Sequence, residues 1–231
     1  MALLAVIVCG FCYNNLIHKT SKYFIPLDKE KPSTLSSRTY ETPEYFAQID
    51  SQAHANCRKF RDSFPHIKDG YRDGDTDLAF TMVVHKDARQ IARLMRMIHR
   101  PNNFYCIHLD RRSPVIFEQA ITGIAKCFGD KTGNVQLVPT KDRVAVEWGD
   151  ESVLRPQMIC GVLALQRHST WTYLLNMVGQ EFPLKTHLEL VASVKALNRS
   201  NLVEAFDIKR FKAWVHGKRL PLGVSEYCRI Q

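Results

Sequence analysis

The chain has 231 residues, of which 45% are hydrophobic and 24% charged, a composition typical of a globular protein and not of a disordered one. Its 32 Lys and Arg residues exceed its 23 Asp and Glu residues by nine, so an anionic partner is favoured over a cationic one. The basic residues are scattered without a long run, which argues against a nucleic-acid partner.

The first 17 residues form an apolar segment that is nearly continuous from Ala2 to Ile17. Its length fits the apolar part of a secretory signal, about 7–15 residues, better than a transmembrane helix of about 20. A buried helix at the start of the domain is the alternative. We expect residues 1–17 to be a signal peptide or a signal-anchor, which would place the rest of the chain in the secretory lumen.

Residues 18–52 are rich in Pro, Ser, Thr and Lys, and we expect them to form a luminal stem that buries little apolar surface. Residues 53–64 are predicted to form a short helix, and residues 68–77 a polar loop. The loop carries three alternating aspartates, as calcium-binding loops do. It lacks the Gly and Glu that an EF-hand requires at its sixth and twelfth positions, so a solvated turn is the better interpretation.

A strand, a helix and a second strand are predicted between Leu78 and Arg112. Residues 78–84 and 104–109 are short apolar runs typical of buried strands. Asp87 is a candidate N-cap for the helix between them, whose apolar residues recur at the spacing of one buried face. The strands of such a unit are parallel, and ligands bind outside their carboxyl ends. This rule places His85 and residues 110–112 at a crevice.

Helices and strands continue to alternate along the rest of the chain. Helices are predicted at residues 114–126, 151–168 and 187–197, and strands at 135–138, 144–148 and 171–177. The predicted class is therefore α/β with a mainly parallel sheet. We assign residues 53–206 to one folded domain and residues 207–231 to a basic tail.

Several common catalytic motifs are absent. The chain has no GxGxxG after its first predicted strand and no GxxxxGK[ST], so NAD-binding and P-loop functions lose their main support. It has no GxSxG and no HExxH, which removes the usual support for a serine hydrolase or a zinc protease. Five cysteines follow the apolar segment without CxxC spacing, so a zinc site is not expected, and an odd number leaves at least one of them unpaired within the chain.

Charged residues gather where the second predicted strand ends. Asp110 stands where metal-dependent glycosyltransferases usually carry Asp-x-Asp, but here a single aspartate is followed by Arg111 and Arg112. Without a metal, the charge on a leaving diphosphate must be met by Lys, Arg or helix N-termini. Asp110 can bind ribose or uracil groups, or it can be a turn residue paired with one of the arginines. For His85 the alternative is a packed histidine at a strand end.

Aromatic and acidic candidates lie further along the chain. Trp148 precedes a predicted helix, where its ring can stack on a base or a sugar, or else belong to the core. Glu181 and Glu204 lie near predicted strand ends, where a carboxylate can bind sugar hydroxyls. The triplet that begins at Asn198 is an N-glycosylation acceptor sequence, and an unused helix C-cap asparagine is its alternative.

Three segments resemble the core-2/I-branching β-1,6-N-acetylglucosaminyltransferases, to which the peptide O-xylosyltransferases are related. They are VVHKDARQIARLMRMIHRPNNFYCIHLDRRSP, AVEWGDESVLRPQMIC and WTYLLNMVGQEFPLKTHLELVASVKALNRSN, and the resemblance runs from about Cys57 to Glu204. It implies a GT-A-like variant of the Rossmann fold in a type II Golgi membrane protein with a luminal catalytic part. It also implies transfer of N-acetylglucosamine from UDP-N-acetylglucosamine to O-glycans on glycoproteins, with inversion and with neither a metal nor another cofactor.

The resemblance implies roles for particular residues. The acceptor-sugar contact falls on Glu204, and the family's cysteine pattern implies Cys57–Cys127 and Cys106–Cys160 disulfides. The donor contacts fall on Val83, Val84, His85, Asp110, Arg111, Arg112 and Trp148.

The C-terminal part departs from the family. The family's glutamate base and its diphosphate-binding Lys and Arg lie well beyond Leu197, and no matching segment is found before Gln231. We therefore expect the fold and the site to be incomplete at the C-terminus, with the catalytic base still unknown. A peptide O-xylosyltransferase and a non-catalytic luminal protein that keeps a donor site are the alternatives.

Overall fold

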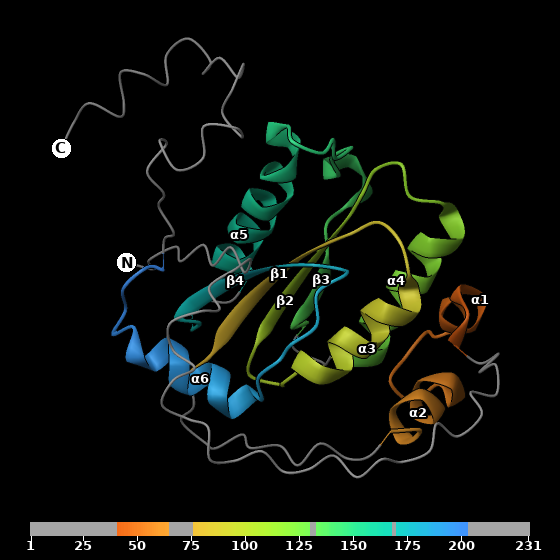
Figure 1. The fold of residues 1–231 in the computed structure, drawn as a ribbon. Coiled ribbons are helices and arrows are strands. Elements are labelled where there is room, and N and C mark those ends of the chain that lie inside the picture. Colours follow the sequence, from red (N-terminus) through yellow and green to blue (C-terminus); the bar gives the residue numbers. More distant parts are fainter. Residues whose placement is uncertain (1–40, 65–75, 130–132, 168–169, 203–231) are drawn as a thin grey trace, which may run out of the picture.

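The structure is a computed structural model that describes residues 41–64, 76–129, 133–167 and 170–202. In these residues four parallel strands form one sheet in the order β3-β2-β1-β4 (Figure 1). This confirms the α/β class with a mainly parallel sheet, as in a GT-A-like variant of the Rossmann fold. The strands are β1 (Leu78–Val84), β2 (Phe104–Leu109), β3 (Val135–Leu137) and β4 (Tyr173–Val178).

Six α-helices and two 3₁₀ turns are described with the sheet, and α5 lies across it from α3 and α4 (Figure 1). Asp87 caps α3 as predicted, because its carboxylate accepts a hydrogen bond from the Gln90 N–H at 3.0 Å. The elements are α1 (Pro43–Ala47), α2 (Ala55–Asp62), α3 (Ala88–Ile98), α4 (Val115–Phe128), η3 (Thr140–Asp142), η4 (Glu151–Val153), α5 (Arg155–Arg167) and α6 (His187–Ala196).

The two faces of the sheet have separate cores. On β2, Tyr105 and Ile107 join the larger core with α3 and α4, whereas Phe104 and Cys106 face α5. Successive side chains of a strand point to opposite faces. His108 and Asp110 therefore follow Cys106 on the face that α5 covers, and this face becomes polar toward the carboxyl end of β2.

Both disulfides implied by the family's cysteine pattern are present. The Cys57–Cys127 bridge joins α2 to α4, and the Cys106–Cys160 bridge joins β2 to α5. Each closes a loop of more than fifty residues, and such a bridge typically stabilises a domain by about 2–4 kcal/mol.

Residues 41–50 are part of the folded domain, so the prediction of a stem does not hold for them. Phe46 of α1 is buried in the larger core, where its ring meets the ring of Phe60 edge to face with centroids 5.3 Å apart. The buried carboxylate of Glu41 accepts from Arg93 at 2.8 Å and from Arg89 at 2.5 Å. Composition pointed to a solvated linker, but these contacts fix the segment.

The predicted stem from residue 18 to residue 40 and the predicted signal at residues 1–17 lie outside the described residues. In the part of the chain that the structure describes, no helix combines the length and the apolar character needed to cross a membrane.

Two predicted elements are corrected. Residues 144–148 form no strand, although the chain there runs beside the end of β2. The helix predicted from Glu151 begins at Arg155, after η4. Pro156 explains the delay, because it has no N–H to donate to the carbonyl of Ser152 and its ring crowds that carbonyl, whereas the first turn of a helix tolerates it.

Candidate functional site

The register of β1 and β2 brings the predicted site residues together. Val83 lies opposite His108, and the Asp110 N–H donates to the Val84 carbonyl at 2.9 Å. The residues that follow β1 and β2 therefore share one edge of the sheet, as the strand–helix–strand pattern predicted. The side chain of Val84 is buried in the larger core, whereas His85 is exposed and is not a packed strand-end histidine.

Asp110 is a buried carboxylate that already has partners. Its Oδ1 accepts from the Arg112 backbone N–H at 2.8 Å and from Arg112 Nε at 3.3 Å. Its Oδ2 accepts from the Val146 N–H at 2.8 Å and contacts an Arg112 terminal nitrogen at 3.4 Å. This is the paired turn residue that the sequence left open as an alternative.

The pKa of the Asp110 carboxyl reflects this setting. Burial pushes the pKa upward, but the hydrogen bonds from Arg112 and Val146 outweigh burial, so the pKa is lower than that of an ordinary aspartate. Asp110 is therefore ionised at neutral pH and holds the guanidinium of Arg112 by charge as well as by geometry.

The two arginines after Asp110 differ in their surroundings. Arg112 lies between two carboxylates, and its guanidinium also donates to the Glu147 carboxylate and to the Val146 carbonyl, each at 2.5 Å. Arg111 has an exposed side chain that lines a neighbouring cleft. Arg112 is thus held in place, while the Arg111 side chain is open to an anionic ligand.

The segment from Arg143 to Trp148 lies against the end of β2. The Val144 N–H donates to His108 Nε2 at 2.9 Å, and the Val144 carbonyl accepts from the Arg111 N–H at 3.0 Å. These bonds replace a strand ladder, which explains why the predicted strand is absent. At the end of the segment, Trp148 is 98% exposed, so it is not a core residue and its ring is free to stack.

The turn after this segment fixes the position of Trp148. The Glu147 N–H donates to Ser152 Oγ at 2.8 Å, and the Ser152 N–H donates to Asp150 Oδ2 at 3.1 Å. Gly149 follows the tryptophan with φ of +80°, a conformation that favours glycine. Trp148 therefore projects from a tight turn with internal hydrogen bonds.

His108 was not among the predicted site residues, although its spacing from Asp110 gave a signal. Residues i and i+2 of a strand point to the same face, so His108 and Asp110 both reach the segment that starts at Arg143. Burial lowers the pKa of the His108 imidazole and Arg143 lowers it further, against the opposing effect of Asp110. His108 is therefore neutral at pH 7.

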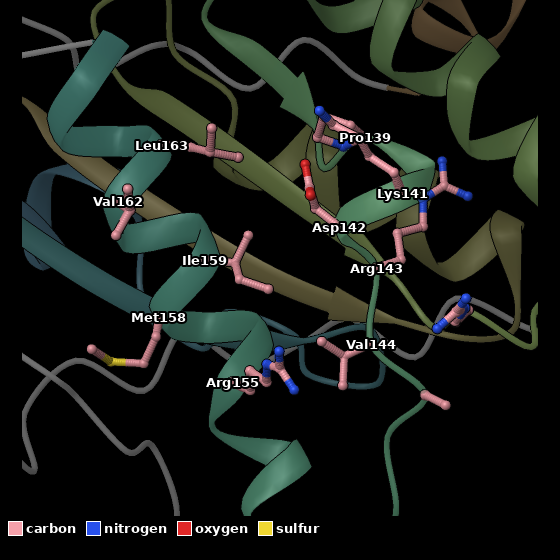
Figure 2. A pocket seen from close by; sticks show the side chains of 12 residues that line it. Pro139, Lys141, Asp142, Arg143, Val144, Arg155, Met158, Ile159, Val162 and Leu163 are labelled. Carbon is pink, nitrogen blue, oxygen red and sulfur yellow. The ribbon is translucent and has the colours of Figure 1, made fainter.

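A cleft of about 740 Å³ lies between α5 and residues 139–145 (Figure 2). Arg111, Lys141 and Arg155 give it three exposed cations, while Ile159 and Leu163 extend from α5 as an aliphatic wall (Figure 2). Arg111 belongs both to this cleft and to the edge of the sheet where β2 ends. The cleft therefore adds positive charge beside the predicted site.

Three candidates remain, of which Glu181 lies at the same edge of the sheet, because β4 runs parallel to β1 and Val178 lies opposite Val83. Glu181 follows β4, where its carboxylate accepts from the Val178 N–H at 2.9 Å, and burial raises the pKa of that carboxyl. Asn198 is exposed just after the end of α6. Glu204, the predicted acceptor contact, lies outside the described residues. Among the residues that the structure describes, no three His, Cys, Asp or Glu side chains group so as to hold a metal ion.

Comparison with known proteins identifies relatives of the chain. It is 35% identical over 166 residues to the beta-1,3-galactosyl-O-glycosyl-glycoprotein beta-1,6-N-acetylglucosaminyltransferase 3 of Bos taurus, and 38% identical over 130 residues to the corresponding transferase 4 of Mus musculus. A bovine herpesvirus 4 protein of the same kind is 34% identical over 166 residues.

The matched regions span 71%, 56% and 71% of this chain but only 36%, 27% and 36% of those relatives, so the chain spans about a third of their length. The family model for the Core-2/I-branching enzymes matches residues 78–221, which include the described sheet edge and continue into the segment predicted as a basic tail. The match covers more than half of the chain, and the chain therefore belongs to the Core-2/I-branching enzyme family.

Proposed function

We propose that this chain carries the donor-binding part of a glycosyltransferase that uses UDP-N-acetylglucosamine. The observation that carries the proposal is the juxtaposition of His85, the cations Arg111 and Arg112, and exposed Trp148 around the ends of β1 and β2, within the family match. The β-1,6-N-acetylglucosaminyltransferase names of the relatives support the choice of sugar and linkage.

Each part of the crevice suits one part of the donor. The exposed ring of Trp148 offers a flat surface on which uracil can stack. Backbone groups of His85, just after the end of β1, can meet the polar edge of the base, whereas the Val83 carbonyl already accepts from the Gly179 N–H. Arg111, whose side chain is open, can neutralise the diphosphate, since hydrogen bonds to charged groups are about twice as strong as neutral ones. Arg112 can join it only by exchanging one of its carboxylate partners for a phosphate oxygen.

The proposed reaction is an inverting displacement at the anomeric carbon. A carboxylate base takes the proton from the 6-hydroxyl of an O-glycan galactose or N-acetylgalactosamine as its oxygen attacks. The bond from the anomeric carbon to the diphosphate oxygen breaks, and UDP leaves with that electron pair. We propose that cationic side chains, rather than a metal, stabilise the charge on the diphosphate.

The cellular setting is part of the same proposal. Two disulfides are typical of proteins that fold in an oxidising compartment. Together with the apolar segment at residues 1–17, they support a type II protein of the Golgi membrane whose catalytic part faces the lumen and acts on glycoproteins.

The test is a transfer assay with the full chain, a panel of UDP-sugars, mucin-type O-glycan acceptors and a serine peptide. We expect transfer from UDP-N-acetylglucosamine to the glycan in β-1,6 linkage, unchanged by a chelator. Transfer of xylose to the serine peptide would instead identify a peptide O-xylosyltransferase. UDP binding without turnover would leave the chain a donor-binding protein that does not catalyse transfer by itself.

A further inference from the structure

The segment from Val144 to Val146 is hydrogen-bonded to the end of β2. The N–H and the carbonyl of both of its end residues, Val144 and Val146, take part. At Val144, the N–H donates to His108 and the carbonyl accepts from the Arg111 N–H. At Val146, the N–H donates to Asp110 and the carbonyl accepts from the guanidinium of Arg112. Three side chains and one backbone N–H, from β2 and the turn after it, therefore take the place of a neighbouring strand.

The bond from Val144 depends on the protonation of His108. Since Nε2 accepts a hydrogen bond, it carries the lone pair, and the single proton of the neutral ring lies on Nδ1. Nδ1 is buried and has no hydrogen-bond partner among the described residues. A second proton on Nε2 would face the Val144 N–H, so two donors would oppose each other and the bond would be lost.

The segment leads directly to the parts of the crevice that would meet a nucleotide. Val146 holds the guanidinium of Arg112 through its carbonyl, and Glu147 holds the same group through its carboxylate. Trp148 comes next, on the turn that Ser152 fixes. A shift of Val144 would therefore move both the proposed stacking ring and the ion pair of a proposed phosphate-binding arginine.

We propose that His108 is a positioning residue, whose neutral imidazole holds residues 144–148 so that Trp148 and Arg112 are in place before a UDP-sugar binds. The contact itself is independent of the function proposed above, and only its effect on nucleotide binding rests on that function. The charged groups that act on the ring are Asp110, on the same strand, and Arg143, at the start of the segment. His108 is fully buried, so its proposed effect runs through the segment and not through direct contact with a ligand.

A matched set of variants of the full chain separates positioning from general stability. His108→Gln keeps an acceptor oxygen close to the position of Nε2 but does not titrate, whereas His108→Leu has no acceptor. His54 provides the control, because its Nδ1 accepts from the Asn56 N–H at 3.1 Å at the start of α2 and it is not a crevice residue. His54→Leu therefore removes the same kind of bond elsewhere.

The first measurement is hydrogen exchange at the Val144 and Val146 amides, which needs no ligand. We expect about threefold to tenfold faster exchange in His108→Leu, the factor that corresponds to one ordinary hydrogen bond, and little change in His108→Gln or His54→Leu. In the native protein, protection of the Val144 amide should fall as the solution is acidified and His108 takes up its proton. This pH titration uses the native protein, so it can still test the role of His108 if His108→Leu fails to fold.

The second measurement is UDP affinity by calorimetry. We expect His108→Leu to lower the affinity about threefold to tenfold while His108→Gln restores it and His54→Leu leaves it unchanged. Unchanged exchange at Val144 in His108→Leu and at low pH would overturn the positioning role. A native chain that shows the exchange effects but binds no UDP would overturn the proposed function and leave His108 as an anchor of the segment.

Discussion

The carboxylate of Asp110 receives two backbone N–H groups and the guanidinium of Arg112, which leaves it little capacity to accept from a ribose hydroxyl. Asp110 therefore contributes to a nucleotide site mainly by positioning Arg112 and Val146. The resemblance implies a donor contact at Asp110, and this stays a prediction. The geometry adds that Asp110 supports Arg112 and the segment that contains Val146.

Asp110→Asn should destabilise the protein and weaken uridine and UDP alike. The amide keeps the shape of the carboxylate but turns one acceptor into a donor, so either Val146 or Arg112 loses its partner. We expect a loss of about 1–3 kcal/mol in the free energy of unfolding, measured with urea at pH 7. Asp142→Asn is the control, because Asp142 is exposed. Equal stability of the two variants would show that the contacts of Asp110 are dispensable.

The low pKa of Asp110 also sets the direction of an acid effect. Since the pKa of this carboxyl is lower in the folded state than in the unfolded state, its stabilisation is complete above the unfolded value of about 4 and is lost as the pH falls below it.

Because of His108, the free energy of unfolding should fall as the pH is lowered from 7.5 to 5.5. The unfolded histidine takes up a proton near pH 6.5, whereas burial first, and Arg143 second, keep the folded imidazole neutral to a lower pH. The unfolded state therefore binds more protons in this window, and the free energy of unfolding rises with pH. Urea unfolding at both pH values should show a smaller change in His108→Gln than in the native chain. An identical pH dependence would contradict the shift, and His54→Gln controls for the loss of a histidine.

Asn198 should carry an N-linked glycan when the chain is made in a secretory pathway. The residue is exposed after α6, and its φ of 46° shows that the helix has already ended there. A glycosidase should increase the electrophoretic mobility of the native chain, and Asn198→Gln should remove that change. Secreted protein whose mobility the glycosidase does not alter would show that the site is unused.

At the scale of elements, β1 and β2 have the bounds that their sequences predicted. Both strands are buried on both faces, so each is a mostly apolar run that stops where the polar edge of the sheet begins. Since these two strands and α3 define that edge, the location of the candidate site could be predicted from sequence as well.

The segments whose structure differs from the prediction depend on contacts between residues that are far apart in the sequence. Val144 is tied to His108, 36 residues earlier, and Arg112 is tied to Glu147, 35 residues later. Residues 41–50 are likewise held by the core and by arginines of α3. Local composition cannot reveal such partners, which is why the strand at 144–148 was predicted and the positioning role of His108 was missed.

The variant Gly123→Ala tests how tightly α1 packs against α4. A Cβ added to Gly123 would lie 1.9 Å from the Phe46 carbonyl oxygen and 3.3 Å from the Ile49 Cβ. In a helix without neighbours, Gly→Ala stabilises by about 1 kcal/mol. We expect Gly123→Ala to destabilise instead, by about 1–3 kcal/mol in urea unfolding, because the backbone of α1 must move. A gain in stability would show that α1 is not docked there.

At the scale of the whole molecule, the two faces of the sheet are covered unequally. In the described residues α3 and α4 pack on one face, while α5 lies on the other with the cationic cleft beside it (Figures 1 and 2). The described chain therefore contains the nucleotide side of the proposed site. Glu204, the proposed acceptor contact, lies outside the described residues, and no described residue is proposed as the base.

We propose above that the edge formed by β1, β2 and the Trp148 turn binds the UDP part of the donor. Calorimetric titration of uridine and UDP into the folded full chain tests it most directly, with Trp148→Ala and Arg111→Ala alongside. We expect both ligands to bind, Trp148→Ala to weaken the binding of both, and Arg111→Ala to weaken the binding of UDP more than that of uridine. A folded chain that binds neither ligand, or whose binding neither variant alters, would contradict it.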